Sequence, residues 1–370
     1  TPVDPDVLEA MLPYFSQAFG NPSSIHTKGH EAKMALEEAR IKIASFIGAS
    51  PSEIYFTSGG TEANNFIIKG IAGANSRKGN HIITSSVEHH SVLDTCHSLE
   101  EDGYLLTYLP VDKHGMVNPD DLYEAITDET TLISIMHANN EVGTVEPIAE
   151  IGRIARDKGI PFHTDAVQTF GHIPIDVNDF YIDALSASAH KLYGPKGVGM
   201  AFIRKGIKAT PTLHGGEQER HYRAGTENMP GIVGFSKAVE IASKVIEKEA
   251  SDSAILRDRL IEGIISSING ACLNGHPKMR LPNNVHISVE GVSGEAMLIA
   301  LRLEGICASN GSACNSSSTE PSHVLVSMGL QDELTRGALR FTIGRETTDR
   351  DIDTVLEVLP AIVKRYKEFH

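Results

Sequence analysis

The sequence predicts an α/β fold in which a mostly parallel sheet lies between helices and a smaller C-terminal αβ domain follows. Apolar runs typical of strands alternate with helical patterns over residues 53–205, and glycine or proline turns separate them. A long helical stretch over residues 230–268 then interrupts the alternation, and a second αβ set follows it. Because 370 residues exceed one ordinary core, we expect two domains. They are residues 1–245 and 246–370, with residues 1 to about 15 packing against the smaller domain.

The strands of the first domain are predicted from short apolar runs bounded by turn residues. We expect strands at 53–60, 81–86, 104–110, 131–137, 161–166, 184–190 and 198–205, with helices at 61–74, 89–103, 118–126 and 147–159. Asn118 followed by Pro119 is typical of a helix start, and Gly103 is typical of the position just after a helix end. The second αβ set comprises residues 283–291, 295–305, 338–344 and a last helix from about Thr348.

The charge, the apolar runs and the cysteine spacing of the sequence exclude several classes of protein. The net charge of −15, from 33 basic and 48 acidic residues, argues against a partner that is nucleic acid or an anionic membrane. No apolar run approaches the roughly 20 residues that span a bilayer, and no signal peptide is visible, so we expect a cytoplasmic protein. The opening residues "TPVDPDVLEAM" lead us to expect a preceding segment. The four cysteines lack CxxC spacing and indicate reduced thiols, with Cys96 and Cys272 expected to be buried and Cys307 to lie in a strand core.

Chemically versatile side chains follow five of the predicted strands. They are Ser58-Gly59-Gly60-Thr61, Glu88-His89-His90, His137 with Asn139 and Asn140, Asp165 with Gln168, and His190-Lys191. Any one of these groups alone is typical of ordinary structure, since most lysines are solvated and most strand-end histidines are structural. In open α/β sheets, however, ligands bind beyond the carboxyl ends of the strands. We therefore expect the five groups to meet at one edge of the sheet and to form a site.

The combination of these groups suits one cofactor, pyridoxal 5′-phosphate. A glycine turn that feeds a helix N-terminus binds phosphate, and His89 can stack on a heteroaromatic ring. Asp165 can hold a pyridine nitrogen protonated, and Lys191 can form a Schiff base with an aldehyde. Nucleotide sites fit less well, because the chain has no G-x-x-x-x-G-K-[ST] loop and "GPKGVG" leads from a strand into another strand.

Eight motifs carry a resemblance to a known family. They are "TSGGTEANN", "VEHHSV", "HANNEVGT", "HTDAVQTFG", "SAHKLYGPKG", "RAGTEN", "NGSACNSS" and "LRFTIGR", in this order along nearly the whole chain. Together they resemble the cysteine desulfurases of NifS/IscS type, which are class V, fold-type I pyridoxal-phosphate enzymes. The resemblance implies that fold, that cofactor, L-cysteine as substrate and a homodimer.

The resemblance also implies roles for the cofactor-binding residues. Lys191 carries the cofactor covalently, His89 stacks on its ring and helps to move protons, and Asp165 pairs with the ring nitrogen. Gln168 pairs with the phenolic oxygen. The phosphate is held by Gly60, Thr61, Ser188 and His190, with Thr226 reaching over from the second subunit.

Substrate and sulfur are assigned in the same way. Asn140 and Arg340 are implied to bind the substrate carboxylate, and Cys314 is implied to be the catalytic sulfur acceptor. The sequence around Cys314, "ASNGSACNSSSTEPS", has no apolar periodicity and predicts a loop, which suits a thiol that collects sulfur at one place and delivers it at another.

The resemblance therefore implies removal of sulfur from L-cysteine to give L-alanine and a persulfide on Cys314, which supplies an iron–sulfur scaffold or a tRNA-thiolation relay. Two alternatives stay open. One is a selenocysteine lyase or an aminotransferase of the same fold, although a simple aminotransferase would not need Cys314. The other is a non-catalytic assembly partner, against which Lys191 and Asp165 argue.

Overall fold

The computed structural model describes residues 1–311 and 321–368, and it divides the chain into two compact units. The first unit comprises residues 1–109, 119–137 and 147–246, and the second comprises residues 110–118, 138–146 and 247–370. Residues 1–15 belong to the first unit rather than to the second, and there the Asp4 N–H donates to the Tyr193 carbonyl at 3.0 Å.

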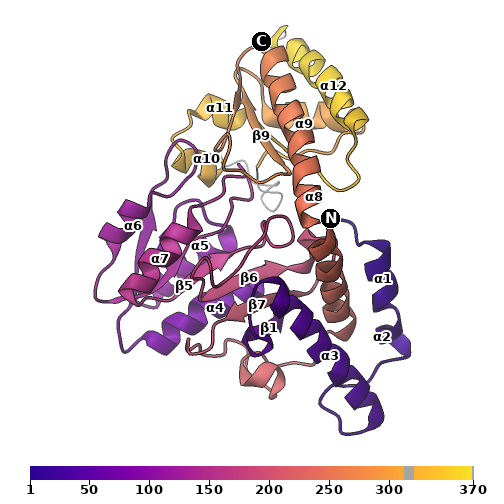
Figure 1. The fold of residues 1–370 in the computed structure, drawn as a ribbon. Helices are drawn as coiled ribbons and strands as arrows, with labels where there is room; N and C mark the ends of the chain where they lie inside the picture. The colour runs from indigo at the N-terminus through magenta and orange to yellow at the C-terminus, as the bar shows by residue number, and fades with distance from the viewer. Residues whose placement is uncertain (312–320, 369–370) are drawn as a thin grey trace. The chain divides into compact units, whose positions relative to one another are not determined.

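The first unit contains a seven-stranded sheet in the order β1-β7-β6-β5-β4-β2-β3 (Figure 1). Its strands are β1 (Ile54–Thr57), β2 (His81–Ser85), β3 (Leu105–Leu109), β4 (Thr130–Ser134), β5 (Phe162–Asp165), β6 (Ala184–Ser188) and β7 (Gly199–Ile203). Strand β7 runs antiparallel to both neighbours, and the other neighbouring pairs are parallel. The predicted α/β fold with a mostly parallel sheet is confirmed.

Helices connect and cover these strands. They are α1 (Pro5–Met11), α2 (Pro13–Ser16), α3 (Thr27–Phe46), α4 (Gly60–Asn75), α5 (His90–Glu101), α6 (Pro119–Ala125), α7 (Ile148–Lys158) and α8 (Met229–Ser267), with 3₁₀ turns at Pro51–Glu53, Ala189–Lys191 and Gln218–His221. Helix α6 begins at Pro119, and Gly103 follows the end of α5 with a φ of 91°, as the sequence predicts. No helix within the described residues has the length and apolar character needed to cross a bilayer.

Apart from the edge strand β3, the sheet of the first unit is buried on both faces, as expected where crossover helices lie on both sides. On one face, apolar residues of α4 and α5 such as Phe66, Ile71 and Leu99 form a core with the sheet. On the other face α7 packs closely, since a Cβ at Gly152 would lie 3.3 Å from the Phe162 ring. The strands are therefore rigid supports for the segments that follow them.

The second unit contains a three-stranded antiparallel sheet in the order β10-β9-β8. Its elements are the later part of α8, β8 (Ala271–Leu273), β9 (Asn284–Val289), α9 (Gly294–Leu303), α10 (His323–Ser327), α11 (Asp332–Arg336), β10 (Ala338–Thr342) and α12 (Asp349–Glu368). Of the cysteines, Cys96 is buried as expected, but Cys272 is only half-buried. Cys307 is exposed and lies outside any strand, because the chain has already left α9 and runs over the surface, so that expectation is wrong.

Candidate active site

The strand directions bring the predicted groups of the first unit to one edge of its sheet, which we call the carboxyl edge. Strands β1, β2, β4, β5 and β6 all end there. The His137 N–H donates to the Asp165 carbonyl at 2.9 Å, and the Ala166 N–H donates to the Ser186 carbonyl at 3.0 Å. The segment that follows β4 is thus tied to the end of β5, and the segment that follows β5 is tied to β6.

Lys191 follows the end of β6. The strand ends at Ser188, two residues earlier than the sequence predicts, and a 3₁₀ turn over Ala189–Lys191 replaces its last part. The Gly194 N–H donates to the Ala189 carbonyl at 2.9 Å. A side chain at residue 194 would not fit here, because its Cβ would lie 2.7 Å from the same carbonyl oxygen. The His172 ring donates from Nε2 to the Lys191 carbonyl at 2.9 Å. The backbone of this half-buried lysine is therefore fixed by close packing and by a side-chain hydrogen bond.

Donors suited to a phosphate lie around the first turn of α4. Gly60 and Thr61 begin this helix, so their N–H groups have no carbonyl partner one turn earlier. A Cβ at Gly60 would lie 2.5 Å from Cγ2 of Val167 and 3.8 Å from Cβ of Ser188, so the turn after β1 is held against the ends of β5 and β6. The Ser188 hydroxyl thus lies beside the α4 N-terminus, as a phosphate cup requires.

His190 lies in the 3₁₀ turn that follows β6, two residues after Ser188. Burial, with a further contribution from the neighbouring Lys191 charge, lowers the pKa of His190 to about 4. The ring is therefore neutral at pH 7 and presents an N–H donor rather than a fixed positive charge. A neutral N–H donor is chemically suited to an oxyanion.

Asp165 ends β5 and is 6% exposed. One carboxylate oxygen, Oδ2, accepts from Asn64 Nδ2 at 2.7 Å, and the other, Oδ1, accepts from the Val167 N–H at 2.9 Å. Because both of these donors are neutral, the carboxylate can also pair with a cation, such as a protonated ring nitrogen. Asn64 was not among the predicted residues. The signal that could have revealed it is its spacing, four residues after Gly60 on the same helix face.

His89 is the N-cap of α5, and its ring is half-buried. Its Nδ1 accepts from the Ser91 N–H at 3.0 Å and lies 2.8 Å from the Ser91 hydroxyl. Ser91 in turn accepts from Asn64 Nδ2 at 2.8 Å. The structure therefore links Asp165 to His89 through two side chains that sequence reasoning missed.

Two further ionisable groups are buried at this edge. Glu88 is fully buried, and its Oε1 accepts from the Ser85 hydroxyl at 2.7 Å and from the Met136 N–H at 2.9 Å. Burial, with a smaller contribution from the Asp165 charge, raises the pKa of Glu88 to about 8. Burial lowers the pKa of His137 to about 3, so this ring stays neutral. The sequence placed both residues at strand ends without assigning them a role.

Gln168 and Thr226 are less buried than Asp165. Gln168 is half-buried in the turn after β5. Thr226 is exposed and lines a pocket of about 130 Å³ together with Thr57, Ser58 and Arg223. Arg223 is paired with Glu62 at 2.7 Å.

The predicted substrate residues lie together in the second unit. Arg340, in β10, donates from Nη1 to the Asn140 carbonyl at 2.6 Å. Its backbone pairs with that of Ser309, which precedes the segment that carries Cys314. Cys314 itself lies outside the described residues.

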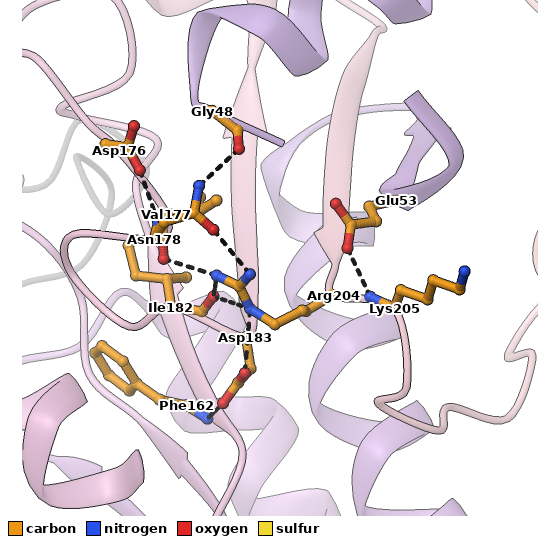
Figure 2. A network of polar contacts seen from close by, with 10 residues as sticks. All are labelled: Gly48, Glu53, Phe162, Asp176, Val177, Asn178, Ile182, Asp183, Arg204 and Lys205. Atoms are coloured by element: carbon orange, nitrogen blue, oxygen red, sulfur yellow. Dashed lines mark hydrogen bonds and ion pairs between the residues drawn. The ribbon is translucent and has the colours of Figure 1, made fainter. Parts of the chain in front are cut away.

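A cavity of about 530 Å³ lies at the opposite edge of the first unit's sheet, where β5 and β6 begin. Figure 2 shows that its Arg204 makes polar contacts with Val177, Asn178, Ile182 and Asp183. The guanidinium donates to the carbonyls of Ile182 and Val177 at 2.7–2.8 Å, donates to Asn178 Oδ1 at 3.0 Å and lies 3.4 Å from the Asp183 carboxylate. These contacts make Arg204 a structural cross-link.

The donor set at the carboxyl edge fits pyridoxal 5′-phosphate. It offers helix N–H groups and hydroxyls for a phosphate, a buried carboxylate for a ring nitrogen and a lysine with a fixed backbone.

Comparison with known proteins agrees. The sequence model of the family described as Aminotransferase class-V matches residues 1–355. A cysteine desulfurase IscS from Methanosarcina thermophila is 58% identical over 99% of this chain and 91% of its own length. A solved structure titled NifS-like protein has a TM-score of 0.93 at 38% identity and covers 99% of this chain and 97% of its own. Another, titled SspA in complex with cysteine, has a TM-score of 0.83 at 40% identity, covering 93% of this chain and 96% of its own. The chain therefore belongs to the class-V aminotransferase family and, within it, to the cysteine desulfurases of NifS/IscS type.

Proposed function

We propose that this protein removes the sulfur atom from L-cysteine, releases L-alanine and holds the sulfur as a persulfide on Cys314. The observation that carries the proposal is the arrangement at the carboxyl edge. There a buried carboxylate, a capping histidine and a fixed lysine follow three strands of one sheet. A solved structure at 40% identity is titled SspA in complex with cysteine, which supports the same substrate here.

The protein is a pyridoxal 5′-phosphate enzyme, and when bound this group withdraws electrons from the substrate Cα. We propose that Gly60, Thr61, Ser188 and His190 hold its phosphate. Their support is the N-terminus of α4 and the neutral His190 ring described above.

Four residues of the first unit would act on its ring and on the substrate. Asp165 would keep the ring nitrogen protonated, because its carboxylate is buried and held by neutral donors. Gln168 would donate to the phenolic oxygen. His89 would stack on the ring. Lys191 would carry the cofactor at rest and would move the proton at the substrate Cα through its Nζ atom.

In the second unit we propose that Arg340 and Asn140 bind the substrate carboxylate. Arg340 suits this role because its planar guanidinium can donate two parallel hydrogen bonds to a carboxylate. The contact between Arg340 Nη1 and the Asn140 carbonyl holds the two residues together.

The sulfur step balances without an added oxidant or reductant. The thiolate of Cys314 attacks the substrate sulfur, a new S–S bond forms and the C–S bond breaks. The electron pair of the C–S bond stays with the substrate carbon, which gains a proton and leaves as alanine. The persulfide is a reversible state that another thiol can accept.

We further propose that the protein works as a homodimer in which Thr226 reaches the partner's phosphate. Large apolar side chains are exposed along the N-terminal segment of the first unit, which a second subunit would cover. They are Leu8, Leu12, Phe15, Phe19, Ile25, Met34 and Ile41. We propose a cytoplasmic location from the unpaired thiols Cys96, Cys272 and Cys307, and an iron–sulfur scaffold or another thiol protein as sulfur acceptor.

The test measures alanine release and protein-bound sulfur after incubation with L-cysteine. We expect Cys314→Ala to abolish sustained alanine release, and the peptide that contains Cys314 in the parent protein to gain one sulfur by mass spectrometry. Cys307→Ala is the matched control because this thiol is exposed and has no proposed role. Full activity of Cys314→Ala, or sulfur on Cys307 instead, would contradict the proposal. Faster release from L-selenocysteine than from L-cysteine would favour the lyase alternative.

A further inference from the structure

We propose that Asn64 and Ser91 are positioning residues of the desulfurase reaction, and that through them Asp165 holds His89 as the tautomer whose ring proton lies on Nε2. The inference rests on the proposed function for its kinetic consequence, but the tautomer follows from the hydrogen bonds alone. A chain of hydrogen bonds connects Asp165 to Asn64, Asn64 to Ser91 and Ser91 to His89. In each of them, the other hydrogen bonds of the two residues determine which group donates.

The carboxylate of Asp165 decides the orientation of the Asn64 amide. Asn64 is 1% exposed, so no solvent replaces its partners. Its Nδ2 lies 2.7 Å from Asp165 Oδ2, and its Oδ1 accepts from the Ser186 hydroxyl at 2.5 Å. Exchanging the two ends of the amide would place two acceptor oxygens 2.7 Å apart. The amide nitrogen must therefore face the carboxylate.

The amide nitrogen decides the direction of the Ser91 hydroxyl. Nδ2 carries two hydrogens, of which one goes to Asp165 and the other to Ser91 Oγ at 2.8 Å. Ser91 is also buried, at 9% exposed. Its oxygen accepts from Asn64, so its own hydrogen is left to donate, and His89 Nδ1 lies 2.8 Å away.

Two donors then converge on His89 Nδ1. One is the Ser91 hydroxyl, and the other is the Ser91 N–H at 3.0 Å, which His89 accepts as the N-cap of α5. A hydrogen on Nδ1 would point at the Ser91 N–H and would break the cap. The neutral ring must therefore carry its proton on Nε2, and only Nε2 can exchange a proton while the cap stays intact.

The register of two helices makes this chain possible. Asn64 lies one turn after Gly60 on α4, and Ser91 is the second residue of α5. Both helices contribute to one core against the same face of the sheet. Asn64 therefore serves two proposed functional residues, because one amide group orients both Asp165 and the ring of His89.

The test compares three variants and two control variants with the parent holoenzyme. Ser91→Ala removes the hydroxyl, Ser91→Thr keeps it, and Asn64→Leu removes the amide without touching His89. Ser98→Ala on α5 and Asn75→Leu on α4 are matched controls that make the same kinds of change away from the chain. The readouts are the imidazole ¹⁵N resonances of His89, assigned with a His89→Gln variant, and kcat for alanine release.

We expect the parent protein to show an unprotonated, hydrogen-bonded Nδ1 and a protonated Nε2. Ser91→Ala and Asn64→Leu should each shift the Nδ1 resonance and lower kcat by on the order of tenfold or more, since small misplacements at a site have such effects. Ser91→Thr should keep both values near those of the parent. A protonated Nδ1 in the parent, or Asn64→Leu indistinguishable from Asn75→Leu, would overturn the inference. A parent protein that releases no alanine would instead refute the proposed function, while the resonances would still report the tautomer.

Discussion

Replacing Arg40 should loosen the loop that carries Thr226. Arg40 on α3 is 3% exposed and forms a two-point ion pair with Glu219 at 2.8 and 2.9 Å. Its Nη1 also donates to the Ile54 carbonyl at 2.7 Å. Glu219 accepts in addition from the Phe56 N–H at 3.1 Å. The pair thus fastens the loop at residues 215–228 to α3 and to β1 within the first unit.

The size of the effect follows from burial. In Arg40→Leu the Glu219 carboxylate, whose side chain is 2% exposed, keeps the Phe56 N–H as its one hydrogen-bond donor among the described residues. Removing one member of a buried ion pair lowers the free energy of unfolding by about 3–5 kcal/mol. Glu219, Arg220 and His221 have φ values of 46°, 56° and 68°, which are strained for side chains with a Cβ, so the loop depends on this anchor to keep its conformation. The double variant Arg40→Leu/Glu219→Leu should recover part of the loss, because no orphan charge remains.

Urea unfolding measures the stability, and limited trypsin digestion at Arg220 and Arg223 measures the release of the loop. We expect a lower urea midpoint and faster cleavage at these two positions. The control is Arg153→Leu, which breaks an exposed pair with Glu150 at 3.6 Å and should change stability by no more than about 0.5 kcal/mol. If Arg40→Leu unfolds at the midpoint of this control, the anchoring role is wrong.

Three further predictions concern the first unit. Asp165→Asn should lower the rate of alanine release by on the order of a hundredfold or more, because an amide cannot hold a ring nitrogen protonated by charge; a near-parental rate would refute this. Glu88→Gln keeps an oxygen that accepts from Ser85 and Met136 but removes a carboxyl group whose pKa is about 8 in the folded protein, above its pKa in the unfolded chain. As the pH rises from about 4.5 to 8, the free energy of unfolding of the parent protein should therefore fall relative to that of the variant. Parallel urea midpoints of the two proteins across this range would contradict that. Arg204→Leu should lower the free energy of unfolding by about 1–3 kcal/mol, since it removes the guanidinium donor of the Ile182 carbonyl and one of the two donors to the Val177 carbonyl, which keeps the Ile182 N–H; calorimetry of the variant checks this.

The large sheet could be predicted from sequence because two signals identify its strands: apolar runs and the turn residues that follow them. The antiparallel placing of β7 between β1 and β6 could not, since periodicity reports burial and not direction. The end of β6 was also missed. The small residues of "SASAH" fit an extended strand, but the close packing of Gly194 on Ala189 turns the chain into a 3₁₀ turn at Ala189.

The division of the chain into two units is also only partly predictable from sequence periodicity. The segments 110–118 and 138–146 belong to the second unit although they follow strands of the first. Within that unit the Arg280 guanidinium donates to the Val142 carbonyl at 2.9 Å, and Asn284 Nδ2 donates to the Glu141 carbonyl at 2.9 Å. Such long-range side-chain contacts leave no periodic signal in the sequence of either segment. The long helical pattern could therefore suggest a boundary near residue 246, but no pattern could suggest that these two segments belong to the second unit.

The residues of the candidate site fall into two classes for the same reason. Groups such as Asp165 and Lys191 follow strands, and strand ends can be predicted from one local pattern together with the rule that parallel strands end at one edge. Asn64 and Ser91 lie instead on helices, where a polar residue near the N-terminus usually indicates capping or solvent. Only the packing of α4 and α5 on one face of the sheet turns these two residues toward each other. Sequence reasoning therefore finds the groups that are proposed to perform the chemistry more readily than those that orient them. A chain whose strand-end residues match a family can still differ in how it orients the same groups.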